Sequence, residues 1–168
     1  VWTAIVTKGT KDAKVAATFS RLSCSKSSRS QLTYAHDASQ AEPQMRTLVT
    51  TYHLAMTDPA QLRAARTPDD PCSIIQVARP TPEFSRYFYT AVGGHWYWTM
   101  RLPWTYAQWQ AFISQPGYEL WYGSHQGAPV GYFELLPHAD ESIEIASFGL
   151  LPHYFGQGFG GQLLTAAI

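Results

Sequence analysis

The chain has 168 residues, no formal net charge at pH 7, and 14% each of charged and aromatic residues. This length fits one domain with a substantial core. The neutral composition gives no electrostatic reason to expect nucleic acid or an anionic membrane as a partner. No apolar run approaches the ~20 residues that span a membrane. The two cysteines, Cys24 and Cys72, form no metal-binding or redox spacing, so a reducing, cytoplasmic setting is expected.

Residues 1–44 differ in composition from the rest of the chain. They contain all four lysines and the serine-rich run 23–30. This basic composition with weak apolar periodicity favours an extension that is disordered or lies outside the fold. Two other interpretations stay open: a transit peptide has a similar composition, and Met45 could be the true start of the protein.

From residue 47 the sequence alternates between strand-forming and helix-forming segments. Thr47–Met56 and Ser73–Arg79 are rich in residues that favour strands. Between them, Asp58–Arg66 predicts a short helix with Asp58 at the N-cap and Pro59 in the first turn.

Two helices are expected next, with an aromatic-rich segment between them. Glu83–Val92 has apolar residues at helical spacing and ends at two glycines, and Tyr106–Ser114 repeats the pattern. Core packing is the ordinary interpretation of any single aromatic side chain here. Taken together, some of Tyr97, Trp98 and Trp104 can line a pocket for a ligand.

Three strands with short links follow, over residues 118–124, 130–136 and 142–150. The link 125–129 contains Gly127, which can adopt a positive φ in a tight turn. Parallel strands need a longer crossover, so these segments predict an antiparallel meander.

A glycine-rich segment joins the last strand to a further helix. Pro152 ends the extended run, and four glycines follow within six positions, before an apolar stripe over residues 163–168 predicts a helix. Glycines let successive N–H groups turn inward around an anion, and a helix N-terminus adds unpaired donors. The segment therefore predicts a site for a phosphate-bearing ligand.

Gly156-x-Gly158-x-x-Gly161 also matches the dinucleotide-binding fingerprint. That motif is expected in the first βαβ unit, with an acidic residue about 20 positions downstream. Here it follows hairpins near the end of the chain, so binding of NAD is the weaker interpretation.

Residues 155–160, Phe-Gly-Gln-Gly-Phe-Gly, follow a Leu-Leu-Pro turn at 150–152. This stretch resembles the signature Arg/Gln-x-x-Gly-x-Gly/Ala of the GNAT superfamily of acyl-CoA-dependent N-acetyltransferases. It departs from that signature at Phe155, where the family usually has Arg or Gln. The resemblance covers roughly residues 47–168. It implies a mixed α/β (α+β) fold, with a mostly antiparallel central sheet flanked by helices and incomplete at the C-terminus. Residues 45–168 would then be a partial domain, and the chain a fragment of a longer one.

The resemblance implies direct transfer of an acetyl group from acetyl-CoA to a primary amine on a small molecule or peptide. It places the coenzyme pyrophosphate on the glycine-rich segment. It also implies that the preceding strand splays from a neighbour to hold the pantetheine arm, with an N–H near Leu150 polarising the thioester carbonyl. The cofactor-binding residues would be Phe148, Gly149, Leu150, Phe155, Gly156, Gln157, Gly158, Phe159, Gly160 and Gly161. Gly149 can equally serve packing alone. Family members often form homodimers, so a homodimer is possible here.

Glu144 and Glu134 are the candidates for the general base. They lie on adjacent predicted strands among apolar neighbours, where a raised pKa would suit proton abstraction. Glu144 is on the strand where many family members carry such a glutamate, and Glu119 is a weaker third. Each glutamate can instead simply face solvent.

No general acid is assigned, and no metal site is expected. The family often supplies the acid from a region beyond Ile168. The six histidines have no paired metal-ligand spacing, and each is expected to be an isolated loop or surface residue. A non-enzymatic acyl-CoA-binding or sensor domain on the same fold remains the alternative to an enzyme.

Overall fold

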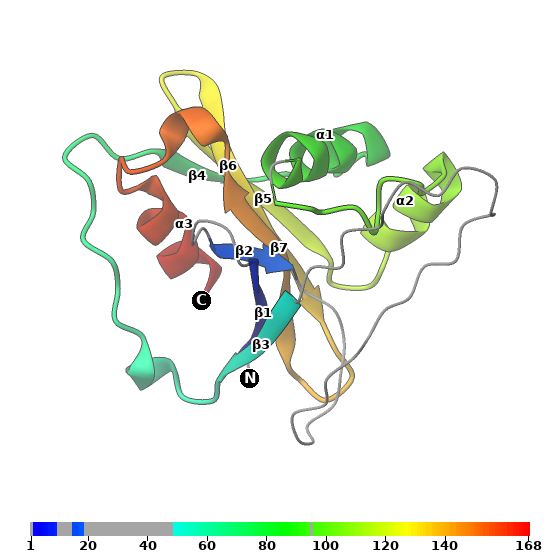
Figure 1. Ribbon diagram of the computed structural model, residues 1–168, viewed down its shortest axis with the longest axis horizontal. Coiled ribbons are helices and arrows are strands. Elements are labelled where there is room, and N and C mark those ends of the chain that lie inside the picture. The colour runs from blue at the N-terminus through cyan, green and yellow to red at the C-terminus, as the bar shows by residue number, and fades with distance from the viewer. Residues whose placement is uncertain (1, 10–14, 19–48, 95) are drawn as a thin grey trace.

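The computed structural model describes residues 2–9, 15–18, 49–94 and 96–168 (Figure 1). Within them the strands form one sheet in the order β3-β1-β2-β7-β6-β5-β4. The strands are β1 Trp2–Gly9, β2 Val15–Thr18, β3 Val49–Met56, β4 Ser73–Gln76, β5 Glu119–His125, β6 Ala128–Pro137 and β7 Ile143–Leu150. The α-helices are α1 Pro82–Gly93, α2 Tyr106–Ile113 and α3 Phe159–Ala167. The predicted mixed α/β fold is confirmed.

Strands β5 to β7 form the predicted antiparallel meander. β4 pairs antiparallel with β5 at the edge of the sheet. β5 and β6 are joined by Gln126 and Gly127, both with positive φ, at 50° and 82°. Two such residues between paired strands match the right-handed twist of a hairpin, and this explains the glycine in the predicted turn.

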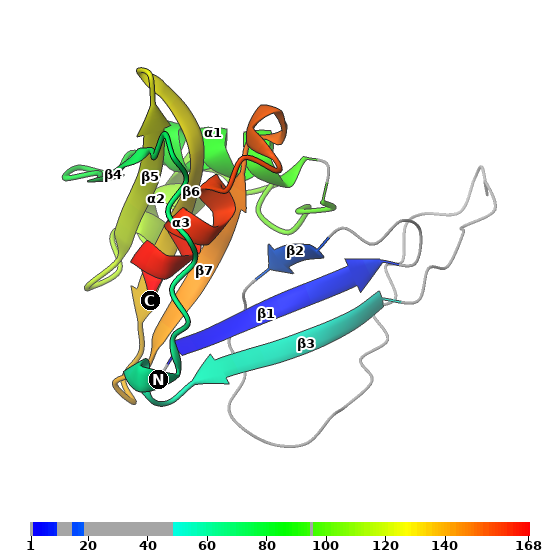
Figure 2. The ribbon, with the colours of Figure 1, turned by 90° about the vertical axis from the view of Figure 1, so that its left-hand side faces the viewer.

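Two segments of the N-terminal region also pair within the sheet. β1 is antiparallel to β3 and pairs in parallel with the start of β7, at Trp2 and Ile143 (Figure 2). β2 is antiparallel to β7 through Ala17 and Phe148. Residues 1, 10–14 and 19–48 lie outside the described part, so the expectation that residues 1–44 form an extension outside the fold stays a prediction. The domain boundary at residue 45 stays a prediction.

The two faces of the sheet carry separate helices, with α3 on one face and α1 and α2 on the other (Figure 2). Side chains alternate between the faces along each strand, so β6 serves both cores: Phe133 packs with α3, and Tyr132 packs with α1. No helix in the described part of the chain is long and apolar enough to cross a membrane.

Helices α1 and α2 begin with side-chain caps. Thr81 accepts the N–H of Phe84 ahead of Pro82, and Thr105 forms a reciprocal capping box with Gln108. Both predicted helices are therefore present, each with a polar residue satisfying an N–H group that has no intrahelical acceptor.

The prediction of a helix at Asp58–Arg66 is wrong. Only the 3₁₀ turn Pro59–Gln61 forms, with the N–H of Ala60 bound to Oδ1 of Asp58 at 2.9 Å. The following residues have no regular structure and run along α3 (Figure 2). There the N–H of Ala65 donates to Oγ1 of Thr165, at 3.0 Å. In a helix, the N–H of Ala65 would donate to a carbonyl one turn earlier. Here it donates to Thr165 of α3 instead, so the helix does not form.

The same segment is fixed to α3 at its far end. The side-chain amide of Gln162 contacts both backbone groups of Cys72. Its Oε1 accepts the N–H at 3.1 Å, and its Nε2 donates to the carbonyl at 2.7 Å. These bonds join residues 90 positions apart and align the start of β4 with the helix.

Candidate functional site

The glycine-rich segment forms a turn between β7 and α3. Gly156 and Gly158 have φ of 77° and 87°, which side-chain-bearing residues rarely adopt. Gly158 is the N-cap of α3 and brings no side chain to cap it; its carbonyl accepts the N–H of Gln162 at 3.3 Å. The N–H groups of the first helical turn have no intrahelical acceptors, so this end of the helix can bind an anion.

The glycines of this segment are favoured at their positions for different structural reasons. A Cβ at Gly161 would lie 2.6 Å from the Cβ of Ala65, and one at Gly160 would lie 3.4 Å from Leu150. A Cβ at Gly156 would meet no atom within 4 Å. Gly161 therefore allows close packing, whereas Gly156 is required by its backbone conformation and borders open space.

The end of β7 is packed closely against α1. A Cβ at Gly149 would lie 2.5 Å from Cγ1 of Val92, which supports the packing interpretation of this glycine. The irregularity in the β6–β7 pairing falls earlier, at Ala146, because Glu134 faces Ser147 and the next residue faces Ile145. β7 stays paired with β6 through Leu150, so the expected divergence of strands is absent on that side. Described pairing with β2 ends at Phe148.

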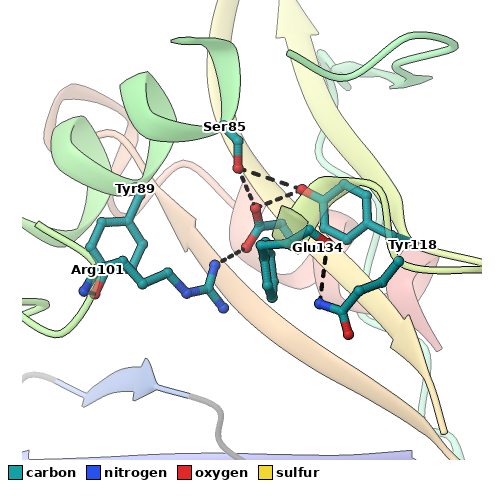
Figure 3. A network of polar contacts seen from close by, with 7 residues as sticks. Ser85, Tyr89, Arg101, Tyr118 and Glu134 are labelled. Atoms are coloured by element: carbon teal, nitrogen blue, oxygen red, sulfur yellow. Dashed lines mark hydrogen bonds and ion pairs between the residues drawn. The ribbon is translucent and has the colours of Figure 1, made fainter. Parts of the chain in front are cut away.

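Glu134 is fully buried at the centre of a polar network (Figure 3). Its Oε1 accepts hydrogen bonds from Oγ of Ser85 at 2.6 Å and from the hydroxyl of Tyr118 at 2.7 Å. Its Oε2 binds Nη1 of Arg101 at 2.7 Å. Residues from α1, the α1–α2 loop and the position just before β5 thus converge on one carboxylate of β6.

The expectation of a raised pKa for Glu134 is wrong. Burial alone would raise it, but the charge of Arg101 and the hydrogen bonds of Ser85 and Tyr118 outweigh burial and lower the pKa of Glu134. Burial, together with the charge of Glu134, raises the pKa of Tyr118 far above its ordinary value. Glu134 is therefore a carboxylate with occupied oxygens, which suits a structural ion pair better than proton abstraction.

The guanidinium of Arg101 is surrounded by aromatic rings. Its central carbon lies 4.0 Å from the ring centre of Phe112, 5.3 Å from that of Trp104 and 5.4 Å from that of Tyr89. The backbone N–H of Arg101 also donates to the hydroxyl of Tyr89, at 3.2 Å. Arginine stacks on aromatic faces in this way, and the contacts add to its ion pair with Glu134.

The three aromatic residues proposed as a pocket lining are placed differently. Tyr97 is 92% exposed, Trp98 is buried, and Trp104 is half-buried against Arg101. Trp98 fills the space left by Gly93, where a Cβ would lie 2.4 Å from its ring. The three side chains therefore do not line a common surface.

Glu144 is buried and makes a contact that the sequence did not indicate. Its Oε2 lies 2.9 Å from Nε2 of His138 in the β6–β7 turn. The turn is held by the N–H of His138, which donates to the carbonyl of Ser142 at 2.8 Å. Glu119, the weaker candidate, accepts a hydrogen bond from the indole of Trp121 at 2.7 Å. The register of the β6–β7 hairpin could have indicated the contact with His138. Leu136 pairs with Glu144, and His138 lies two residues after Leu136, close to the same glutamate.

A family model described as Acetyltransferase (GNAT) family matches residues 78–168, more than half of the chain. The chain belongs to the GNAT acetyltransferase family. This membership supports an acetyltransferase-type function in general. No curated protein and no solved structure matches the chain.

Within the matched GNAT region, the α1–α2 loop lies beside the glycine-rich segment. The ring centres of Trp96 and Phe155 are 6.0 Å apart. Phe155 occupies the position where the GNAT signature usually has Arg or Gln, and its side chain is 40% exposed. An aromatic contact thus takes the place of a polar side chain at this edge of the predicted phosphate site.

Two histidines of the GNAT region are paired, contrary to the expectation of isolated residues. His138 contacts Glu144, and Nε2 of His125 lies 2.8 Å from Oδ2 of Asp70. Among the described residues, no three His, Cys, Asp or Glu side chains form a group that could hold a metal ion.

Proposed function

We propose that this GNAT domain transfers an acetyl group from acetyl-CoA directly to a primary amine. The observation that carries the proposal is the turn at Gly156 and Gly158, which opens directly into the N-terminus of α3 within the family match. Backbone donors and open space at Gly156 fit a pyrophosphate group. Acetyl-CoA supplies an activated thioester, so that amine and thioester yield an amide and the free thiol.

The binding residues of the proposal are mainly backbone groups. The N–H groups of residues 156–161 are the proposed donors to the pyrophosphate. The N–H of Phe155 donates to the carbonyl of Pro152 at 3.3 Å, and Phe155 offers the pyrophosphate no polar side chain. Residues 148–150 hold the pantetheine arm, and an N–H near Leu150 polarises the carbonyl of the thioester. The side of β7 facing away from β6 suits this role, because the β6 side remains paired.

We assign the general base to Glu144 in preference to Glu134. An amine must lose a proton to attack. Because Glu144 lies six residues before Leu150 on β7, about 20 Å away at ~3.3 Å per residue, its carboxylate would accept the proton through a chain of water molecules. Among the described residues, the hydrogen-bond partner of the Glu144 side chain is His138, through Oε2, which leaves Oε1 available. The oxygens of Glu134 are both engaged. His138 would act as a positioning residue for Glu144.

The test is calorimetric titration of the full-length protein with acetyl-CoA, with NAD as control, followed by an amine panel. Acetyl-CoA should bind and NAD should not. Glu144→Gln should reduce kcat by about 10²–10⁴-fold while leaving acetyl-CoA affinity unchanged. Glu141→Gln, an exposed glutamate in the same turn, is the matched control and should retain full turnover.

The rival function is a non-enzymatic acyl-CoA sensor on the same fold. It predicts acetyl-CoA binding without turnover of any amine, and that outcome would replace our proposal. Failure to bind acetyl-CoA at all would refute both functions.

A further inference from the structure

The edge of β7 that faces away from β6 presents the backbone groups that the proposed function assigns to acetyl-CoA. The N–H of Leu151 donates to the carbonyl of Val130, at 2.9 Å, and therefore points toward β6. A trans peptide places its C=O opposite its N–H, so the carbonyl of Leu150 points away from β6. In an extended strand the N–H and C=O of one residue point to the same edge, and the edge alternates from residue to residue. The groups of Leu150 and Phe148 thus both point away from β6.

Strand β2 occupies part of this edge. Ala17 pairs with Phe148 and Thr18 with Ser147, in antiparallel register. Because the backbone groups of Phe148 point toward β2, Ala17 and Phe148 are the pair that exchanges N–H and C=O groups. β2 also lies outside residues 78–168, the region that the family model matches. A segment from outside the matched domain therefore binds the edge on which the coenzyme is proposed to lie.

The course of β1 explains why β2 can reach this edge. β1 pairs in parallel with β7 near the start of both strands, at Trp2–Ile143 and Thr3–Glu144, and the two strands separate farther along (Figure 2). β2 lies between them in the order of the sheet and pairs with both. The place beside β7 that a linear ligand would take is thus filled by β2.

The pairing of β2 with β7 is short. It comprises two residue pairs, whereas β6 pairs with β7 from Ile143 to Leu150. A few hydrogen bonds at a strand edge contribute little net stability, so such a segment can open without unfolding of the protein. The pantetheine arm of acetyl-CoA contains two amides, and amides can hydrogen-bond to a strand edge in place of another strand. The arm and β2 are therefore alternative occupants of the same backbone groups.

We propose that β2 is a displaceable inhibitory strand, which pairs with Phe148 in the free protein and leaves when the pantetheine arm of acetyl-CoA binds β7. This inference rests on the proposed acetyl transfer. Binding then requires the fraction of molecules in which β2 is unpaired, and the apparent affinity for acetyl-CoA is reduced by that fraction. The N-terminal region thereby sets the acetyl-CoA concentration at which the protein becomes active.

The first measurement is hydrogen exchange on the wild-type protein, which depends neither on activity nor on a variant that folds. Saturation with acetyl-CoA should accelerate exchange of the N–H of Ala17 about tenfold, while the N–H of Phe148 stays protected because the arm replaces β2. The control ligand is adenosine 3′-phosphate 5′-diphosphate, the nucleotide half of coenzyme A without the arm. It should leave the exchange of Ala17 unchanged. Unchanged or slower exchange of Ala17 with acetyl-CoA would overturn the inference.

The second measurement is calorimetric affinity in two proline variants. Ala17→Pro removes the N–H that bonds to Phe148 and should raise the affinity for acetyl-CoA about tenfold, with the affinity for the nucleotide half unchanged. Ala16→Pro is the matched control, because the backbone groups of Ala16 point to β1, where it pairs with Thr7. Its affinity for acetyl-CoA should stay within about threefold of the wild type. Equal gains in both variants would show that pairing with Phe148 is not what limits binding, and would overturn the inference.

The outcomes separate this inference from the proposed function. If acetyl-CoA fails to bind the wild type and Ala17→Pro alike, the proposed function fails, and with it the role of β2. If acetyl-CoA binds both proteins with the same affinity, and Ala17 stays protected in the wild type, the inference alone is overturned.

Discussion

The two faces of the sheet differ in how they are packed. On the α3 face, β6 and β7 contribute Phe133 and Ile145 to an apolar core with Leu163. On the α1–α2 face, the core is aromatic and encloses the Glu134–Arg101 ion pair. Buried charges are costly unless paired, and replacing them by apolar residues often stabilises a protein. The α1–α2 face therefore has a polar arrangement that stability alone does not require.

The same face carries further features of this kind. Within the described residues, the indole nitrogens of Trp98 and Trp109 are buried without a hydrogen-bond partner. Unpaired buried donors cost stability, as the exposed, strained Tyr97 does. Natural proteins tolerate such costs mainly at functional sites. The buried ion pair and the unpaired indole donors therefore concentrate costs in stability on the α1–α2 face.

The largest expected effect comes from breaking the buried ion pair. Arg101→Met leaves the Glu134 carboxylate buried without its partner and should reduce the free energy of unfolding by about 3–5 kcal/mol, measured by urea denaturation. Adding Glu134→Gln to this variant should restore most of the loss. A single-variant loss below about 1 kcal/mol would mean that the pair behaves like a surface one.

On the α3 face, Leu163→Ala should cost about 2–5 kcal/mol, because Leu163 is fully buried and its removal leaves a cavity. Urea denaturation measures this loss. A loss below about 1 kcal/mol would contradict the close packing of Leu163 in the α3 core.

A smaller effect is expected at the junction of α3 with the preceding segment. Gly161→Ala should cost about 1–3 kcal/mol through overpacking against Ala65, even though alanine favours helices. Ala65→Gly should rescue it, as seen by thermal unfolding. Gly156→Ala should not be rescued, since its cost comes from a positive φ and not from a contact.

The smallest effect is the acid dependence of stability. The pKa of Glu134 is lower in the folded protein, so its contribution is present above the unfolded pKa of ~4.3 and is lost as pH falls through the folded value. Below pH ~4, the wild type should lose stability more steeply than the Arg101→Met, Glu134→Gln double variant. Parallel pH profiles of unfolding free energy would contradict the lowered pKa.

Local patterns were sufficient to predict much of this fold. Apolar residues at helical spacing, a glycine stop, and strand-forming runs with short links identified α1, α2 and the meander. The glycine-rich segment identified the turn before α3. These features depend on neighbours within a few positions, which a single sequence displays directly.

Contacts between distant residues account for the failures. The ionisation of Glu134 is set by Arg101, 33 positions earlier, and by Ser85, 49 positions earlier. The segment after Gln61 loses its helix to contacts with Thr165, 100 positions later in the case of Ala65. Burial and charge pairing of this kind arise only when the chain folds, so no local pattern revealed them.

The bond between Gln162 and Cys72 has a consequence for synthesis of the chain. Cys72 leaves the ribosome 90 residues before the amide that pairs with its backbone. At ~5–20 residues per second, the two are separated by several seconds of translation. During that interval the start of β4 has unpaired backbone groups, and the emerging hairpins have one open face. The α3 face therefore assembles late in synthesis. Until then the exposed apolar face of the hairpins is the part of the nascent chain that chaperones would need to protect.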